Sequence, residues 1–139
     1  MMLLKRNVEL GLFIVRVLTG IIFLLHGFSK FQGGIGGTMG FFQSIGLPGA
    51  LAPVVAIIEI LGGLLLILGL LTRIAAVALT VIMVGVLLTA KAGQPFMMGT
   101  EFDYLLLFTS LQLAFTGSLL LSVDSLLFKN KYNSRLAEN

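Results

Sequence analysis

The sequence predicts an all-α membrane protein, built as an antiparallel bundle of four transmembrane helices with a short outer interfacial helix. Composition is the first reason: the 139 residues are 58% hydrophobic and only 11% charged, whereas an ordinary soluble domain carries about 25% charged residues. The second reason is that four long apolar runs divide the chain, at residues 10–28, 50–71, 74–90 and 103–123. Each approaches the ~20 residues with which an α-helix crosses a bilayer.

The first run, residues 10–28, is expected to be a helix that is retained in the protein. Lys5 and Arg6 precede it, as basic residues precede the apolar part of a signal peptide. However, Arg16 lies inside the apolar stretch, and no Ala-x-Ala-like cleavage site follows. Both features are wrong for a signal peptide, so we interpret the run as the first transmembrane helix.

The link after this helix, residues 29–49, combines many glycines with large apolar side chains such as Phe41. A fully solvated loop would not keep so many apolar side chains. The link therefore predicts a short helix over residues 38–45 that lies in the outer membrane interface. We expect Thr38 to cap its start and residues 46–49, Gly-Leu-Pro-Gly, to end it.

The remaining runs complete the bundle. Only about Leu71 to Arg73 separates the second run from the third, which forces an antiparallel hairpin. Residues 92–102, which contain glycine and proline, are expected to form a second outer loop before the last apolar run. We therefore expect one transmembrane domain over residues 1–128 and a polar tail over residues 129–139.

Lysine and arginine are distributed unequally between the two ends of the predicted bundle. The end with both termini and the central hairpin turn holds six of them, and the opposite end holds only Lys30 and Lys91. Basic residues collect on the cytoplasmic side of membrane proteins, so both termini are predicted to be cytoplasmic. The formal net charge of +3 then belongs to helix ends that contact the lipid bilayer, and no nucleic-acid partner is expected.

Cysteine is absent, and His26 is the only histidine. Thiolate nucleophiles, disulfides, cysteine-ligated zinc and iron–sulfur clusters are therefore excluded from this polypeptide, and so is a haem held by two histidines of one chain. We expect neither a metal site nor a covalently bound cofactor. Redox chemistry would need a diffusible cofactor or one that a partner carries.

Two ionisable residues fall inside the apolar runs and are the first candidates for function. Arg16 and Glu59 would each cost about 2.5–3.5 kcal/mol to insert into a bilayer unless they are sheltered. Their depths predict that they pair, with Gln112 of the last helix completing one buried polar cluster. Such a cluster either serves a reaction, with Arg16 and Glu59 as catalytic residues and Gln112 as a ligand contact, or only holds the helices together.

A second polar group is predicted at the outer end of the first helix. His26 and Lys30 lie four residues apart on one helix face, and Glu101 and Asp103 begin the last helix at the same level. A nearby carboxylate would make His26 a proton donor or acceptor near neutral pH, which makes it a catalytic candidate and the other three ligand contacts. Alternatively, His26 and Lys30 only anchor the helix at lipid headgroups. Arg73 is expected to bind cytoplasmic phosphates.

Three blocks in this order resemble the signature of the DoxX family of small bacterial membrane proteins, over roughly residues 9–128. They are Arg16…Gly20…His26-Gly27-Phe28-Ser29-Lys30-Phe31, then Glu59-x-x-Gly62-Gly63…Gly69-Leu70-Leu71-Thr72-Arg73, then Gly117…Leu121-Ser122-Val123-Asp124. The resemblance implies four membrane helices and a multi-pass location in the bacterial cell membrane. It also implies a relation to subunits of an archaeal thiosulfate:quinone oxidoreductase, and many bacterial members are named as candidate oxidoreductases. The polar positions of the family fall on Arg16, His26, Lys30, Glu59 and Arg73.

The first hypothesis for function is a quinone-linked oxidoreductase component that acts with a redox partner protein. A non-covalently bound quinone would accept hydrogen bonds from Arg16 or His26, and Glu59 would relay protons. The second hypothesis is a non-enzymatic scaffold or a small transporter whose buried charges shape a path or a docking surface. A purely structural subunit is a third. A glycine-bearing helix face also favours a homodimer.

Overall fold

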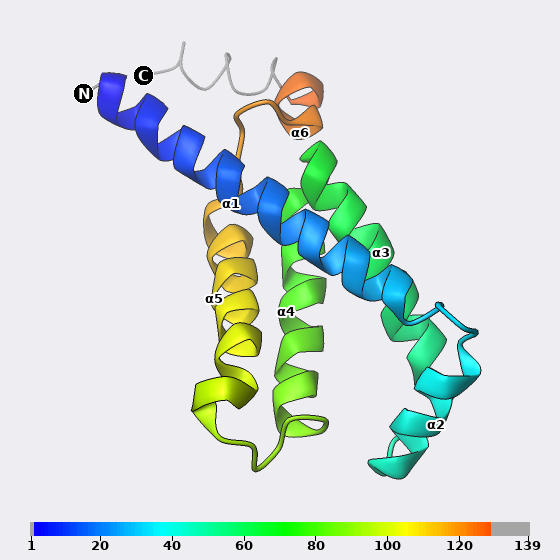
Figure 1. Cartoon of the computed structure of the whole chain (residues 1–139). Coiled ribbons are helices and arrows are strands. Elements are labelled where there is room, and N and C mark those ends of the chain that lie inside the picture. Colours follow the sequence, from blue (N-terminus) through cyan, green and yellow to red (C-terminus); the bar gives the residue numbers. More distant parts are fainter. Residues whose placement is uncertain (1, 129–139) are drawn as a thin grey trace.

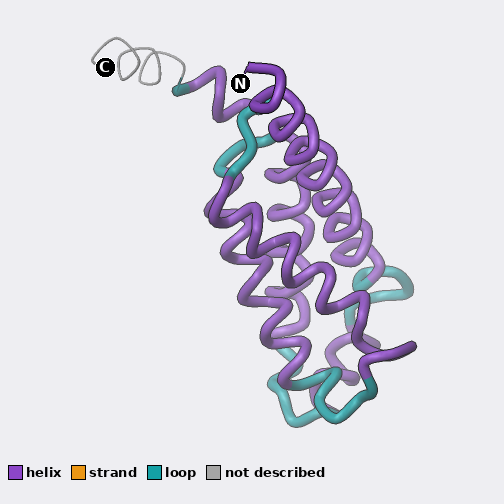
Figure 2. Tube along the Cα trace, turned by 90° about the vertical axis from the view of Figure 1, so that its left-hand side faces the viewer, coloured by secondary structure: helices purple, strands orange, loops and turns teal. Residues whose placement is uncertain are grey.

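The computed structural model describes residues 2–128, and within these residues all regular secondary structure is helical. It contains, in chain order, α1 (Met2–Ser29), α2 (Gly36–Ser44), α3 (Leu51–Leu68), α4 (Thr72–Leu88), the π-helical turn η1 (Phe96–Thr100), α5 (Glu101–Thr116) and α6 (Val123–Leu127). The four long helices α1, α3, α4 and α5 lie alongside one another (Figures 1 and 2). The start of α1 and α6 lie at one end of this bundle, and α2 and η1 lie at the other (Figure 1). The all-helical class is confirmed.

Glycine lets α1 and α3 approach closely along their length. A Cβ atom on Gly20 would lie 2.7 Å from the carbonyl oxygen of Gly63, and one on Gly27 would lie 2.8 Å from that of Ala56. These distances are shorter than real Cβ contacts, so larger residues do not fit without a shift of the backbone. Gly20 therefore lies beside Gly63, and Gly27 beside Ala56, which fixes the antiparallel register of the two helices.

The turn between α3 and α4 is as tight as the sequence predicts. Gly69 ends α3 with φ 67° and Leu71 precedes α4 with φ 49°, so two left-handed residues reverse the chain. The carboxylate of Asp124 accepts hydrogen bonds from the backbone N–H groups of Leu71 and Thr72, at 2.8 and 3.0 Å. Asp124 thereby caps the start of α4 from the far end of the described chain.

Side chains from all four long helices form the core, while apolar side chains also cover the outside. Buried core residues include Phe23, Leu66, Leu79, Met83 and Leu113. Two helical segments, Leu3–Ser29 within α1 and Leu51–Leu68, are long and apolar enough to cross a membrane, and α4 is apolar but has 17 residues.

The structure corrects two sequence-based boundaries. The short helix α2 begins at Gly36, and Thr38 does not cap it but donates to the carbonyl oxygen of Lys30 at 3.0 Å. The last apolar run is not one helix, because α5 ends at Thr116 where Gly117 has φ 64°. The chain then turns before α6, with Leu121 also at positive φ (47°). The predicted tail at 129–139 lies outside the described residues.

Candidate functional site

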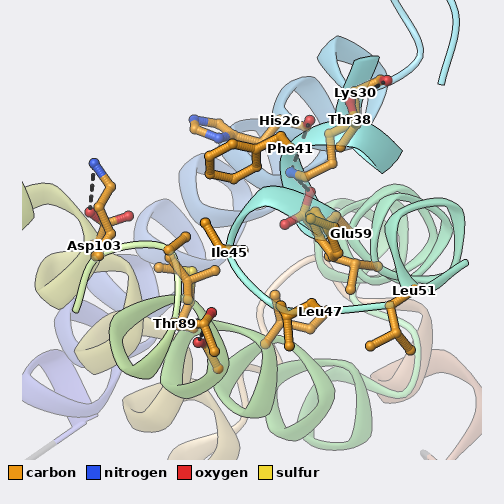
Figure 3. Close-up of a pocket in the computed structure, with 18 of the residues that line it drawn as sticks. His26, Lys30, Thr38, Phe41, Ile45, Leu47, Leu51, Glu59, Thr89 and Asp103 are labelled. Carbon is orange, nitrogen blue, oxygen red and sulfur yellow. Dashed lines mark hydrogen bonds and ion pairs between the residues drawn. The ribbon is translucent and has the colours of Figure 1, made fainter. Parts of the chain in front are cut away.

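A cavity of about 660 Å³ lies at the α2 end of the bundle. Its walls come from α1, α3, α4 and α5, and α2 with the segment that follows it adds a further wall (Figure 3). Most of the lining is apolar: Phe23, Phe41, Phe42, Ile45, Leu47, Leu51, Val55, Ile82, Met83, Val86, Phe102 and Leu106. A few polar side chains interrupt it, a composition typical of sites for small organic molecules.

An ion pair between Lys30 and Glu59 faces this cavity. The Nζ atom of Lys30 lies 2.5 Å from Oε2 of Glu59, and the side chains are 21% and 5% exposed. Lys30 lies just past the end of α1, and Glu59 lies in the middle of α3 on the face that packs against α1. The long lysine stem therefore reaches inward along the bundle to a carboxylate that the fold has already buried.

His26 lies one helical turn before Lys30 and also lines the cavity. Its imidazole ring stacks on Phe102 of α5, with ring centroids 5.9 Å apart and an interplanar angle of 25°. In the described part of the chain, no carboxylate lies within ion-pair distance of His26. The expected carboxylate partner is therefore replaced by an aromatic ring, and His26 is an exposed residue.

A second ion pair contributes to the opposite side of the cavity. Lys91, beyond the end of α4, lies 3.7 Å from Oδ2 of Asp103 in the first turn of α5. Lys91 also donates to the carbonyl oxygen of Gly99 at 3.2 Å. Both charged residues line the cavity.

Glu101 does not reach the cavity, although it is only two residues from Asp103. Its carboxylate accepts hydrogen bonds from the backbone N–H groups of Met98 and Gly99, at 2.8 and 2.9 Å. The backbone N–H groups of Glu101 itself, Met98 and Gly99 donate hydrogen bonds to this carboxylate, and they hold its pKa below the ordinary value. Glu101 therefore stabilises the turn before α5 and does not line the cavity.

The predicted pairing of Arg16 with Glu59 is wrong, although both side chains are buried as expected. Arg16 donates to the carbonyl oxygens of Ser118 and Leu121, at 3.1 and 2.9 Å, and it contacts the turn at Gly69. The register of α1 on α3 explains the error. Arg16 lies near Gly69, which is ten residues, or about 15 Å of helix, beyond Glu59.

Arg16 is the centre of a polar cluster at the other end of the bundle, which we call the clasp: Glu9, Arg16 and residues 117–124. Glu9 accepts from the backbone N–H groups of Leu119 and Leu120, at 3.1 and 3.3 Å. The guanidinium of Arg16 is fully buried and satisfies the carbonyl groups of the same segment. The clasp therefore fastens the irregular chain after α5 onto α1.

Two further predicted ligand contacts are not at the cavity. Gln112 is exposed on α5 and does not join Arg16 or Glu59 in a cluster. Arg73 is exposed at the clasp end, where it donates to the carbonyl oxygen of Thr116 at 3.3 Å. Of the predicted site residues, the structure thus brings together His26, Lys30, Glu59 and Asp103.

The cavity also contains residues that sequence reasoning missed. Lys91, which the sequence offered only as a topology signal, pairs with Asp103, and α2 supplies Phe41 and Phe42 to the lining. The apolar side chains in the glycine-rich link were the sequence signal that could have predicted the contribution of Phe41 and Phe42. Among the described residues, no group of three histidine or carboxylate side chains is placed to hold a metal ion.

The sequence pattern of the DoxX family matches residues 11–92, which is more than half of the chain. The chain belongs to the DoxX family. The DoxX match covers α1 to α4 and therefore includes the Lys30–Glu59 pair, while the clasp segment after α5 lies beyond it.

Three curated bacterial proteins are similar in sequence to the chain. The chain is 48% identical over 134 residues to "Putative oxidoreductase CatD" of Bacillus subtilis (strain 168), covering 96% of this chain and 99% of that protein. It is 42% identical over 79 residues to "Uncharacterized membrane protein Rv3486" of Mycobacterium tuberculosis (strain ATCC 25618 / H37Rv), covering 55% of this chain and 48% of the relative. It is 34% identical over 73 residues to "Inner membrane protein YqjF" of Escherichia coli (strain K12), covering 52% of this chain and 55% of the relative. No solved structure matches the chain.

Proposed function

We propose that the protein crosses the membrane four times and places the clasp end in the cytoplasm. The exposed surface of α4 supports this, because an apolar stripe runs along it at helical spacing: Ile74, Val77, Val81, Val84 and Leu88. Leu105, Phe108 and Phe115 form a similar exposed stripe on α5. Water would disfavour such surfaces, whereas acyl chains solvate them. The excess of lysine and arginine at the clasp end gives the orientation.

We further propose that the protein is the membrane component of a quinone-linked oxidoreductase, with the cavity as the quinone site. One observation carries the proposal: a charged Lys30–Glu59 pair faces a largely apolar cavity. The volume of about 660 Å³ fits a ring-bearing molecule and lies within the range of ordinary small-molecule sites. Apolar walls suit a lipid-soluble ring, and the lysine and histidine supply donors for its carbonyl oxygens.

The residues of the cavity have distinct roles in this proposal. A quinone supplies the chemistry of accepting two electrons and two protons. Lys30 donates a hydrogen bond that orients one carbonyl oxygen, and His26 donates from the same wall. Glu59 holds and passes on a proton at the carboxylate that Lys30 now occupies. Electrons come from a partner protein or from a soluble thiol or thiosulfate, because the chain contains no cysteine and only one histidine.

Binding of a naphthoquinone to the purified protein in lipid nanodiscs tests the proposal. Wild-type protein is expected to bind the naphthoquinone above the level of empty nanodiscs, and Lys30→Met is expected to weaken binding at least about tenfold, because it removes a charge-assisted donor to the quinone oxygen. Arg73→Met at the opposite end is the matched control and is expected to bind normally. Absence of binding by wild type would overturn the quinone site. If Glu59→Gln then abolished partner assembly or solute flux without changing quinone redox state in membranes, a function as a scaffold or transporter would replace the quinone-linked function.

A further inference from the structure

We propose that Lys91, which Asp103 positions, donates to the second oxygen atom of the bound ring, at the end opposite Lys30. This inference rests on the proposed quinone site and specifies the kind of ring that the site selects. A molecule with one oxygen at one end would use Lys30 and leave the second pair without a partner. The cavity is therefore predicted to distinguish two-ended from one-ended rings.

The two ion pairs come from different helices and lie on different sides of the same cavity. Lys30 and Glu59 belong to the α1 and α3 walls, whereas Lys91 and Asp103 belong to the α4 and α5 walls. Figure 3 shows Asp103 on one side and Glu59 on the other, with the ring of Phe41 between them. A flat molecule beside Phe41 would thus meet a lysine–carboxylate pair at each end.

The balance of charge favours a neutral molecule. Two lysine ammonium groups and two carboxylates line the cavity, so apart from His26 the ionised groups cancel. An anion or a cation would have to break one of the pairs and leave a charge without a partner in a largely apolar surrounding, which is costly. A neutral molecule with polar ends can accept from the lysines without breaking either pair.

Lys91 is free to contact a bound molecule without losing its present contacts. Its separation of 3.7 Å from Asp103 exceeds hydrogen-bond length, and its side chain is 34% exposed. An ammonium group has three N–H donors, and the carbonyl oxygen of Gly99 accepts one of them. At least one donor of Lys91 therefore remains for an oxygen atom of the bound molecule.

Binding of a matched pair of probes tests this inference. Anthraquinone has carbonyl oxygens at both ends of its central ring, whereas anthrone has one. Dissociation constants are measured by titration of wild-type protein in nanodiscs, with empty nanodiscs correcting for partition into lipid. Wild type is expected to bind anthraquinone about tenfold more tightly than anthrone, the effect of one charge-assisted hydrogen bond.

Variants assign the discrimination to the second ion pair. Lys91→Met is expected to weaken anthraquinone binding about tenfold and to leave anthrone binding unchanged, so that the two probes bind alike. Asp103→Asn is expected to reduce the discrimination, because Lys91 loses the carboxylate that positions it. Arg73→Met is the control, since Arg73 is exposed at the clasp end of the bundle, and it is expected to behave as wild type.

Three outcomes are decisive. Equal binding of both probes by wild type, or unchanged discrimination in Lys91→Met, overturns the second contact while leaving the quinone site intact. Failure of wild type to bind either probe overturns the proposed function itself. Melting temperatures of all variants are recorded in parallel, and Lys91→Ala, which also lacks a donor, replaces Lys91→Met if the latter is not folded.

Discussion

The Nζ atom of Lys30 donates to Oε2 of Glu59 at 2.5 Å, across the contact between the outer end of α1 and the middle of α3. The acid is almost completely buried, and the lysine is the more exposed partner. The pair therefore joins the two helices and also places a carboxylate at the wall of an apolar cavity. A stabilising role and a functional role of the same pair can be separated by measuring stability and ligand binding on the same variants.

Removal of Lys30 is expected to destabilise the protein more than removal of both partners. Lys30→Met leaves the buried carboxylate of Glu59 without a partner and should cost about 2 kcal/mol, less than for a fully buried pair because the lysine is partly exposed. In the double variant with Glu59→Gln, most of this loss should return. Reversible unfolding in mixed micelles measures all four proteins of the cycle, and additive effects would show that the two side chains do not interact.

Arg16 is expected to support the fold and not the cavity. Arg16→Met leaves the carbonyl oxygens of Ser118 and Leu121 without donors and should lower stability by about 2–4 kcal/mol. Naphthoquinone binding by the folded fraction should change less than about twofold, since the clasp lies at the other end of the bundle. Arg73→Met, which removes an exposed arginine, serves as the control. A large loss of affinity at unchanged stability would instead assign Arg16 to the binding site.

The glycine contact between α1 and α3 is expected to tolerate no side chain. A Cβ on Gly63 would lie 2.6 Å from the backbone oxygen of Gly20 and from the backbone nitrogen of Leu24. Gly63→Ala should therefore cost about 1–3 kcal/mol, as overpacking does. Gly11→Ala, in α1, meets no atom within 4 Å and should be neutral or slightly stabilising. Thermal unfolding of the two variants makes the comparison, and equal effects would show that the helices are farther apart.

Acid is expected to loosen the turn before α5. The pKa of Glu101 is lowered by backbone N–H donation, so its carboxylate stabilises the turn fully above the ordinary carboxyl pKa, and this contribution is lost as the pH falls through the lowered value. Protection of the Met98 and Gly99 amides against hydrogen exchange, corrected for intrinsic rates, should fall over that range. In Glu101→Gln the protection should not depend on pH there. Constant protection in wild type would rule out the carboxylate as the acceptor.

Local sequence features predicted the class, the hairpin and the burial of both charged residues. The apolar runs required helices, and the few residues between the second and third runs allowed only a tight reversal. Insertion cost alone indicated that Arg16 and Glu59 would be sheltered, and both are.

The partners of these charges depended on information that single segments do not contain. The depths of Arg16 and Glu59 from the two membrane surfaces suggested that the two residues meet. However, the glycine contacts set a register of α1 on α3 in which Glu59 lies beside the last turns of α1. Arg16 then finds its acceptors in carbonyl groups after α5, where Gly117 and Leu121 turn the chain out of the predicted helix. Backbone acceptors have no sequence signature, so this end of the bundle could not be predicted.

Photolabelling of the protein in native membranes with an azido-naphthoquinone tests most directly whether the cavity is the quinone site. We expect mass spectrometry to find the label on cavity residues such as Phe41, Met83 and Phe102, and we expect excess unlabelled quinone to abolish the labelling and Lys30→Met to weaken it. Label that is confined to the clasp, or that persists unchanged in Lys30→Met, would contradict the assignment of the cavity as the quinone site.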